Sequence, residues 1–295
     1  MSVAGHPAAR VARRRARPHE VLGRLFVPAL VLSFLVVATF LLLPIVAVFL
    51  ELSPRKIVEQ LGSEVAVDAI LVTLETTGIS TALIWAFGTP AAYLIATRRF
   101  RGRAFAITLL ELPLVLPPAV AGIGLLAAFG SLGLLGGTLD ELGLRLSFTQ
   151  TAVTIAVTFV ASPFYLRGAI SAFESVDRTL IDAARTLGAS PARAFWRVAL
   201  PLALGGLGAG AALAFARGIG EFGATIMFAG SFQGVTQTLS LAIYQEFDVN
   251  FDVALAISAM LVVVSGTLLL AIKVVPGWTR SAWTSPSPSA RSASS

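Results

Sequence analysis

The sequence has 295 residues, 56% of them hydrophobic and only 13% charged, with a net charge of +6 and no cysteine. Soluble domains carry about 25% charged residues, so this composition argues against a soluble protein. The absence of cysteine excludes disulfides and thiolate metal sites, and the two histidines, His6 and His19, both lie near the N-terminus. Neither Lys56 nor Lys273 follows a Gly-rich phosphate-binding loop. We therefore predict no catalytic residue, metal site or ATP site in this chain.

Six long apolar segments follow one another along the chain and predict six transmembrane helices. Each approaches or exceeds the ~20 apolar residues that a helix needs to cross a bilayer. The fold class predicted is therefore an all-α, polytopic membrane protein. The predicted spans are residues 26–50, 69–96, 105–129, 152–172, 202–228 and 253–275.

The two ends of the chain differ from the part between them. Residues 1–24 are rich in arginine and predict a basic cytoplasmic tail, whereas residues 276–295 are rich in Ser, Pro and Ala and predict a disordered one. The first apolar segment resembles a signal peptide in its basic flank, but it is longer and ends at Glu51–Pro54 rather than at small residues. We therefore predict a retained helix and a transmembrane domain over residues 25–275.

The segments that connect the predicted spans alternate in charge. Arginine dominates the turn after the second span and the segment 173–201, whereas acidic residues dominate the segments 130–150 and 229–252. Because Lys and Arg are retained on the cytoplasmic side of a membrane, this alternation predicts an even number of spans with both termini in the cytoplasm. It also explains the net positive charge without any nucleic acid.

Among the charged residues inside the predicted spans we single out four, because an unpaired charge there costs at least ~2.5–3.5 kcal/mol. Glu75 and Glu111 belong to the second and third spans. We interpret Glu75 as a packing or interface residue rather than a ligand. Arg217 and Glu221 are four residues apart in the fifth span and share a helix face. They form either a structural ion pair or part of the pathway or its gate.

Two spans carry unusual residue patterns. The second has a polar stripe at helical spacing, which indicates either close helix packing or a pore lining. We favour packing for this stripe. The third contains Pro113, Pro117 and Pro118, followed by Gly122. Prolines remove backbone donors, so this span must be broken or kinked, either to line a pathway or to allow packing. The residues of the polar stripe are Thr73, Thr76, Thr77, Ser80 and Thr81.

The loop at about residues 177–201 predicts a short helix, a turn and a second helix that returns to the bilayer. Gly188 suits a helix C-terminus, and Ser190–Pro191 suits the start of the next helix. An apolar stripe runs along the first helix, which also fits an amphipathic helix that rests on lipid. The stripe consists of Leu180, Ala183, Ala184 and Leu187.

This loop resembles the EAA loop of bacterial ABC importer permeases. That pattern is Glu-Ala-Ala, three residues, Gly, nine residues and Ile-x-Leu-Pro. Here the same spacing joins Asp182, Ala183, Ala184, Gly188 and the run Val198–Pro201. Aspartate replaces glutamate and valine replaces isoleucine, which keeps charge and shape. The resemblance implies that Asp182, Ala183, Ala184, Gly188 and Pro201 belong to a coupling loop that docks on an ATPase subunit.

Two further segments resemble the molybdate and sulfate branch of these permeases. Residues 112–122 resemble its PLVLPP-x-V-x-G signature, and residues 215–244 resemble the FAR-x-x-GEFGAT block of the molybdate permeases. Ser240 stands where that block has proline. The resemblance covers roughly residues 65–275. It makes pathway or gate candidates of Arg217, Glu221, Pro117, Pro118 and Thr225.

The resemblance implies a type I ABC importer transmembrane domain in a bacterial cell membrane. The partners it implies are a second copy of the chain, a dimer of an ABC ATPase subunit that binds ATP and Mg²⁺, and an extracytoplasmic substrate-binding protein. The implied cargo is molybdate or tungstate, with sulfate or thiosulfate as the alternative. A gradient-driven transporter is a distant alternative. We find no cluster of acids, histidines or nucleophiles that a membrane enzyme would need.

Overall fold

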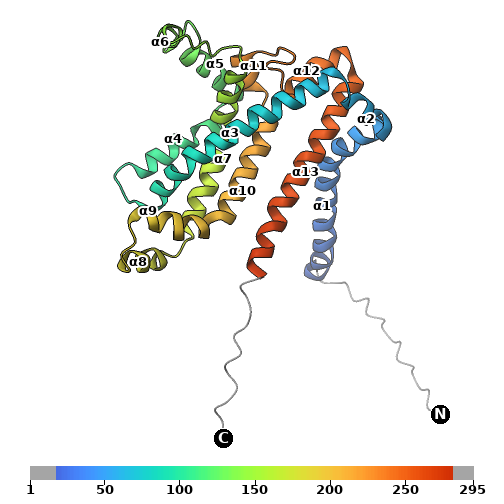
Figure 1. Ribbon diagram of the computed structural model, residues 1–295. Helices are drawn as coiled ribbons and strands as arrows, with labels where there is room; N and C mark the ends of the chain where they lie inside the picture. The colour runs from blue at the N-terminus through green and yellow to red at the C-terminus, as the bar shows by residue number, and fades with distance from the viewer. Residues whose placement is uncertain (1–17, 282–295) are drawn as a thin grey trace, which may run out of the picture. The chain divides into compact units, whose positions relative to one another are not determined.

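The computed structural model describes residues 18–281, all of whose regular elements are helices (Figure 1). The chain divides into one unit that ends at Glu51 and a second that begins at Leu52. The first unit contains helix α1 (Pro18–Glu51), with a mean hydropathy of 2.8 over its most apolar part. Apolar residues occupy all sides of α1, as expected of a helix surrounded by lipid. This confirms the all-α prediction for the described residues.

Three helices form the centre of the second unit. These are α3 (Glu64–Thr97), α7 (Gln150–Glu174) and α10 (Leu200–Ile219). Side-chain caps begin two of them: Ser63 accepts from Ala66 N at 3.4 Å, and Thr149 accepts from Ala152 N at 3.3 Å. The most apolar part of α7 is 61% buried, against 33% for α3 and 28% for α10. Helix α7 is therefore the central span.

The polar stripe of the second predicted span lies in this centre. Thr73, Thr76, Thr77 and Ser80 are each at most 1% exposed. Ser80 Oγ donates to Thr154 O of α7 at 2.9 Å, and Thr76 Oγ1 donates to Val72 O at 2.6 Å. The hydroxyls of Thr76 and Ser80 are therefore satisfied inside the helix contact. The packing interpretation accounts for these side chains.

Glycines let α10 approach its neighbours closely. A Cβ on Gly206 would lie 2.5 Å from Ala172 Cβ of α7, and a Cβ on Gly218 would lie 2.9 Å from Thr77 Cγ2 of α3. Real Cβ atoms do not come so near. These positions fix how α10 sits against α7 and α3.

Replacing Gly206 with valine is expected to lower the free energy of unfolding by ~1–3 kcal/mol, because α10 must move away from α7. The matched control is Gly205→Val, since a Cβ on Gly205 has no atom within 4 Å. The measurement is the melting temperature of the protein in detergent. Equal melting temperatures for the two variants would contradict the packing at Gly206.

The third predicted span is broken, as its prolines indicated. Helices α4 (Arg103–Val115) and α5 (Pro118–Phe129) are bent by 111° relative to each other. Leu116 and Pro117 between them have extended ψ angles of 131° and 132°. The helical backbone conformation is disfavoured for a residue that precedes proline. Leu116 precedes Pro117, and Pro117 precedes Pro118, so both residues are restricted in this way. The prediction of a broken or kinked segment is confirmed.

The prediction of one continuous span over residues 202–228 is wrong. Helix α10 ends at Ile219, and α11 (Gly223–Ala229) begins after a break at Gly220–Phe222. The carboxylate of Glu221 accepts from Ala224 N at 2.8 Å and so satisfies a free donor at the start of α11. At its other end this span is longer than predicted, because an apolar helical stretch runs from Pro191 to Ile219.

The predicted coupling loop has the predicted form. Helix α8 (Arg178–Thr186) is followed by Gly188 with φ +85° and by α9 (Pro191–Ala194), which Ser190 caps. A π-helical stretch, η1 (Phe195–Ala199), then leads into α10, with Leu200 N donating to Phe195 O. Pro201 offers no backbone donor, so the chain cannot continue a regular α-helix across this point.

Further helices differ from the sequence prediction. The short helices α2 (Pro54–Leu61), α6 (Gly136–Glu141) and α12 (Leu239–Val249) lie in segments predicted only as connections. The last helix, α13 (Phe251–Ser281), extends beyond the predicted end at 275. Residues 18–24 and 276–281, predicted as tails, are therefore helical. The remaining tail predictions lie outside the described residues.

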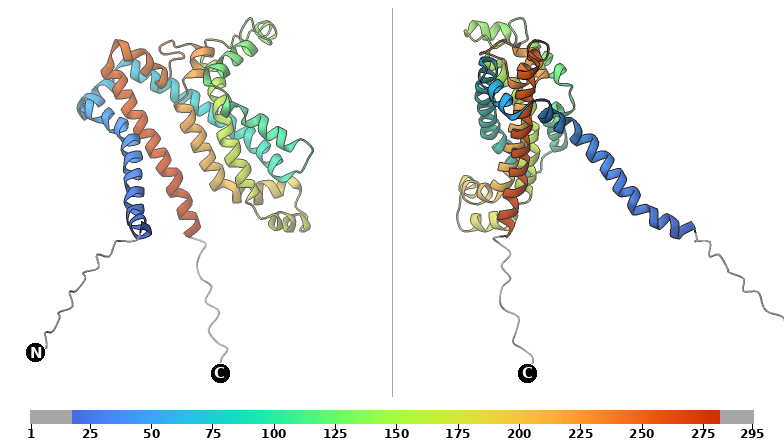
Figure 2. Two further views of the ribbon diagram at one scale, coloured as in Figure 1. Left: turned by 180° about the vertical axis from the view of Figure 1, so that it is seen from behind. Right: turned by 90° about the vertical axis from the view of Figure 1, so that its right-hand side faces the viewer.

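The second unit has two distinct ends. Helices α8 and α9 lie at one end, whereas α2, α6, α11 and α12 lie at the other (Figures 1 and 2). Five described helices are long and apolar enough to cross a membrane, and the bent pair α4–α5 raises the number to six. The chain is a multi-pass membrane protein.

Candidate functional site

The residues singled out from the sequence form two groups at opposite ends of the bundle. The first group is the coupling loop at the end with α8. Asp177 caps α8 by accepting from Thr179 N at 2.9 Å, and this backbone hydrogen bond holds the pKa of the Asp177 carboxyl below its ordinary value. Asp182 and Ala183 are exposed, and Leu187 is 89% exposed. An exposed leucine beside a carboxylate suits contact with another protein.

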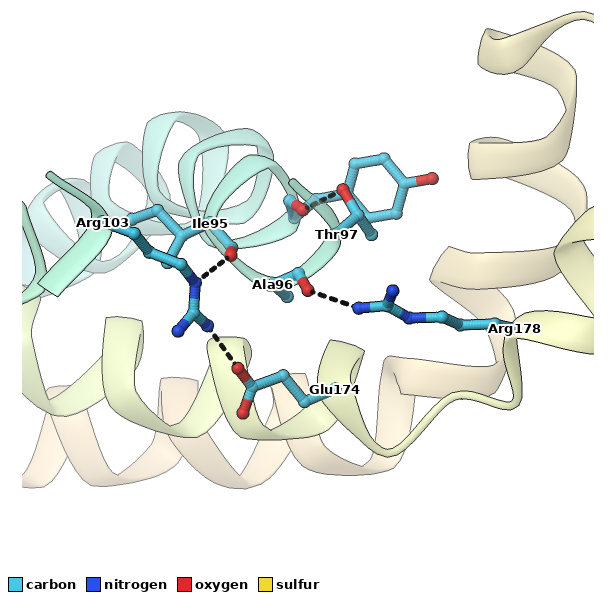
Figure 3. A network of polar contacts seen from close by, with 7 residues as sticks. Ile95, Ala96, Thr97, Arg103, Glu174 and Arg178 are labelled. Atoms are coloured by element: carbon cyan, nitrogen blue, oxygen red, sulfur yellow. Dashed lines mark hydrogen bonds and ion pairs between the residues drawn. The ribbon is translucent and has the colours of Figure 1, made fainter. Parts of the chain in front are cut away.

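One arginine attaches this loop to the bundle, and a second connects the neighbouring helices at the same end (Figure 3). Arg178, the first residue of α8, donates to Ala96 O of α3 at 3.4 Å. Arg103 of α4 donates to Ile95 O at 2.8 Å and pairs with Glu174 of α7 at 2.5 Å. The C-terminal end of α3 carries a partial negative charge that cations stabilise. These contacts connect α8 to α3, and α4 to both α3 and α7.

The second group surrounds the break between α10 and α11. Arg217 Nη2 lies 2.6 Å from Glu221 Oε2, and the two side chains are 27% and 1% exposed. The other oxygen of Glu221 accepts from Ala224 N. Glu221 therefore holds both the last turn of α10 and the first turn of α11. Thr225 lies in α11 and is fully buried.

The broken span and the broken α10–α11 segment meet at their bends. A Cβ on Gly223 would lie 2.6 Å from Pro118 Cβ, and a Cβ on Gly122 would lie 2.7 Å from Ala224 O. Pro117 and Pro118 themselves are exposed. The structure thus brings Pro118 together with the Glu221–Thr225 segment, although the two lie far apart in the sequence.

The end of the second signature packs on the same region. The N–H of Leu239 begins α12, where it has no acceptor within the helix, and it donates to Thr73 Oγ1 of α3 at 2.8 Å. Ser240, which replaces a proline of the resembling block, donates from Oγ to Ile219 O at 3.4 Å. Thr236, Gln237 and Thr238 are at most 3% exposed. This segment is therefore part of the framework around the break.

Sequence reasoning did not single out Arg167, a charged residue inside the fourth predicted span. Arg167 of α7 pairs with Glu111 of α4, with 3.0 Å between Nε and Oε1. Glu111 was singled out, but its partner lies in another span, so the sequence could not join them. A scan for every ionisable residue inside the apolar segments would have found Arg167. Glu75, predicted to be a packing or interface residue, accepts from Gln150 Nε2 at 3.2 Å.

Residues 88–275 match the family described as "Binding-protein-dependent transport system inner membrane component". The chain is 41% identical over 233 residues to the "Molybdenum transport system permease protein ModB" of Mycobacterium tuberculosis, which covers 79% of this chain and 88% of that protein. It is 35% identical over 237 residues to the "Sulfate transport system permease protein CysW" of Synechocystis, with coverages of 79% and 85%.

Among solved structures, the chain resembles one of a bacterial alginate ABC transporter in complex with an alginate-bound periplasmic protein. The TM-score is 0.68 at 17% identity, over 92% of this chain and 99% of that one. At this identity the likeness supports the fold alone. The family match and the 41% identity go further: the chain belongs to the inner membrane components of binding-protein-dependent transport systems, the permease subunits of ABC importers.

Proposed function

We propose that this chain is the membrane-spanning permease subunit of an ATP-driven importer for molybdate. The observation that carries the proposal is the 41% identity to the mycobacterial molybdenum permease over most of both chains. A permease protein from Haloferax volcanii, named as a probable molybdenum ABC transporter subunit, is 40% identical over 80% of this chain. The aligned region includes the framework around the α10–α11 break.

In this proposal the end with α8 faces the cytoplasm, because it carries the basic loops and the positive-inside rule retains these there. The exposed face of α8, including Asp182, Ala183 and Leu187, docks on an ATPase subunit. That subunit binds ATP and Mg²⁺, and this chain contributes no catalytic residue. Closure of the ATPase dimer then pulls on α8, and Arg178 passes the movement to α3.

Transport requires further partners. The central helices of one copy pack against each other, so we expect the route to lie between two copies. An extracytoplasmic binding protein selects the oxyanion and delivers it to the end with α11. The permease itself should hold the anion weakly, because tight binding would retain the cargo inside the membrane.

The subunit role is tested by reconstituting this chain in vesicles with and without its ATPase and binding protein. Molybdate uptake is expected only when both partners and ATP are present, and the chain is expected to purify with the ATPase in equal copy number. Uptake that persists without the ATPase would contradict the proposal and indicate a gradient-driven transporter.

Sulfate is the second candidate cargo. The identity of 35% to the sulfate permease of Synechocystis supports it, although more weakly than the molybdenum relatives support molybdate. Both are tetrahedral dianions, so the same fold and the same coupling loop serve either one. Competition between the two anions separates these candidates.

A further inference from the structure

The central helix α7 exposes only polar residues. All but four of its side chains are buried or half-buried. Three of these four exposed residues, Arg167, Ser171 and Glu174, lie on the half of α7 toward α8. Arg167 and Ser171 are four residues apart and share one face. By contrast, the exposed residues on the same half of α13 include Leu269, Leu270 and Val274. The four exposed residues of α7 are Thr151, Arg167, Ser171 and Glu174.

This polar face borders a cavity of about 740 Å³. Four helices contribute to its walls, namely α4, α7, α10 and α13. Much of the wall consists of small residues, which leave space beside the guanidinium of Arg167. Residues of the wall include Leu114, Arg167, Ser171, Gly206, Gly210 and Leu269.

Arg167, which lines this cavity, forms an incomplete ion pair with Glu111 of α4. Arg167 is 64% exposed and Glu111 is 35% exposed, and the recorded contact joins Nε to Oε1 at 3.0 Å. The two terminal nitrogens of Arg167 donate no hydrogen bond to any group within residues 18–281. A guanidinium that faced lipid in this way would be strongly disfavoured. Water beside this face of α7 would satisfy the free nitrogens of Arg167.

We propose that Arg167 is a transit site for the oxyanion and that Glu111 competes with the anion for the guanidinium. This rests on the proposed function and deepens it. The terminal nitrogens of arginine match two oxygens of a tetrahedral dianion. The carboxylate of Glu111 neutralises part of the same charge, so the anion is held weakly and released. At a rise of ~1.5 Å per residue, Arg167 lies about 10 Å before the end of α7, close to the cytoplasmic exit.

The two members of the pair are expected to act in opposite directions on anion binding. Glu111→Gln keeps the shape of the side chain but removes the competing charge, so molybdate should bind at least tenfold more tightly and leave more slowly. Arg167→Gln removes the donor, so this binding should be lost. In both variants the maximal rate of uptake should fall, at least tenfold for Arg167→Gln. Arg167→Lys keeps the charge and should retain part of both activities.

The experiment measures equilibrium binding of molybdate to the purified permease–ATPase complex without the binding protein, and the uptake rate of the reconstituted importer. Molybdate binding that is present in the wild-type complex and lost in Arg167→Gln is assigned to the Arg167 site. Binding that persists in the variant is assigned to the ATPase. Arg145→Gln is the matched control, because Arg145 also pairs with an acid, Asp140 of α6, and α6 lies at the other end of the bundle (Figure 1). Its binding and uptake should equal those of the wild type.

A purely structural pair predicts a different result. Both single variants would then reduce the yield of the complex, neither would change anion binding, and the double variant would recover uptake. That pattern would overturn the transit site while leaving the molybdate importer in place, since the wild type would still transport. If the wild type carried no oxyanion at all, the proposed function would fail and the transit site with it.

Discussion

Replacing Glu221 with alanine is expected to abolish uptake and to destabilise the protein by about 3 kcal/mol. The change leaves Arg217 without its partner in a largely buried position, and breaking a buried pair on one side is strongly destabilising. It also removes the acceptor for Ala224 N at the start of α11. The measurement is the yield and melting temperature of the purified protein, followed by uptake.

Glu221→Gln is the matched control. The glutamine keeps an oxygen that can accept from Ala224 N, but it loses the charge that pairs with Arg217. Its stability should therefore lie between the wild type and Glu221→Ala. If Glu221→Ala were as stable and as active as the wild type, the role of this carboxylate at the break would be excluded.

Replacing Gly188 with valine is expected to reduce uptake more than tenfold while the bundle stays folded. Gly188 has a φ of +85°, and a β-branched side chain is disfavoured there by about 1–2 kcal/mol. A Cβ at this position would meet no atom within 4 Å, so the strain is confined to the turn between α8 and α9. The orientation of α8 changes, and ATP hydrolysis no longer drives transport.

The control for this turn is Gly188→Asn, because asparagine tolerates a positive φ better than valine does. It should retain most of the uptake. The readouts are uptake, ATP hydrolysis by the reconstituted complex and the melting temperature of the permease. Normal uptake in Gly188→Val would count strongly against the coupling role of this loop.

Local patterns in the sequence predicted the features that local chemistry determines. The prolines at 117 and 118 predicted the bend between α4 and α5, and Gly188 with Ser190 predicted the turn between α8 and α9. Apolar length predicted the spans, because a bilayer imposes this length on any helix that crosses it. The resemblance of the coupling loop and of residues 215–244 then indicated the family, which the comparisons confirm.

Features that depend on contacts between distant segments could not be predicted in this way. Residues 202–228 are mostly apolar, and Arg217 and Glu221 stand at helical spacing, so the sequence predicts one continuous helix and not the break after Ile219. The break depends on the carboxylate of Glu221 and on the approach of Gly223 to Pro118 of α5. Likewise, the pairing of Arg167 with Glu111 requires α4 and α7 to lie side by side.

Placement of the gate candidates also needed the structure. The sequence grouped Arg217, Glu221 and Thr225 by a shared motif, and the structure joins them to Pro118 at one end of the bundle. The assignment of Arg217 and Glu221 to the pathway or its gate stays a prediction. Their ion pair accounts for both charges by itself, so their structural role does not depend on cargo.

The most direct test of the central claim is the uptake of labelled molybdate at nanomolar concentration by cells that carry this chain with its ATPase and binding protein. A large excess of sulfate is added as the competitor. We predict ATP-dependent uptake that persists in the presence of sulfate. Uptake abolished by sulfate would contradict the molybdate assignment and identify the chain as a sulfate permease with the same fold and coupling loop.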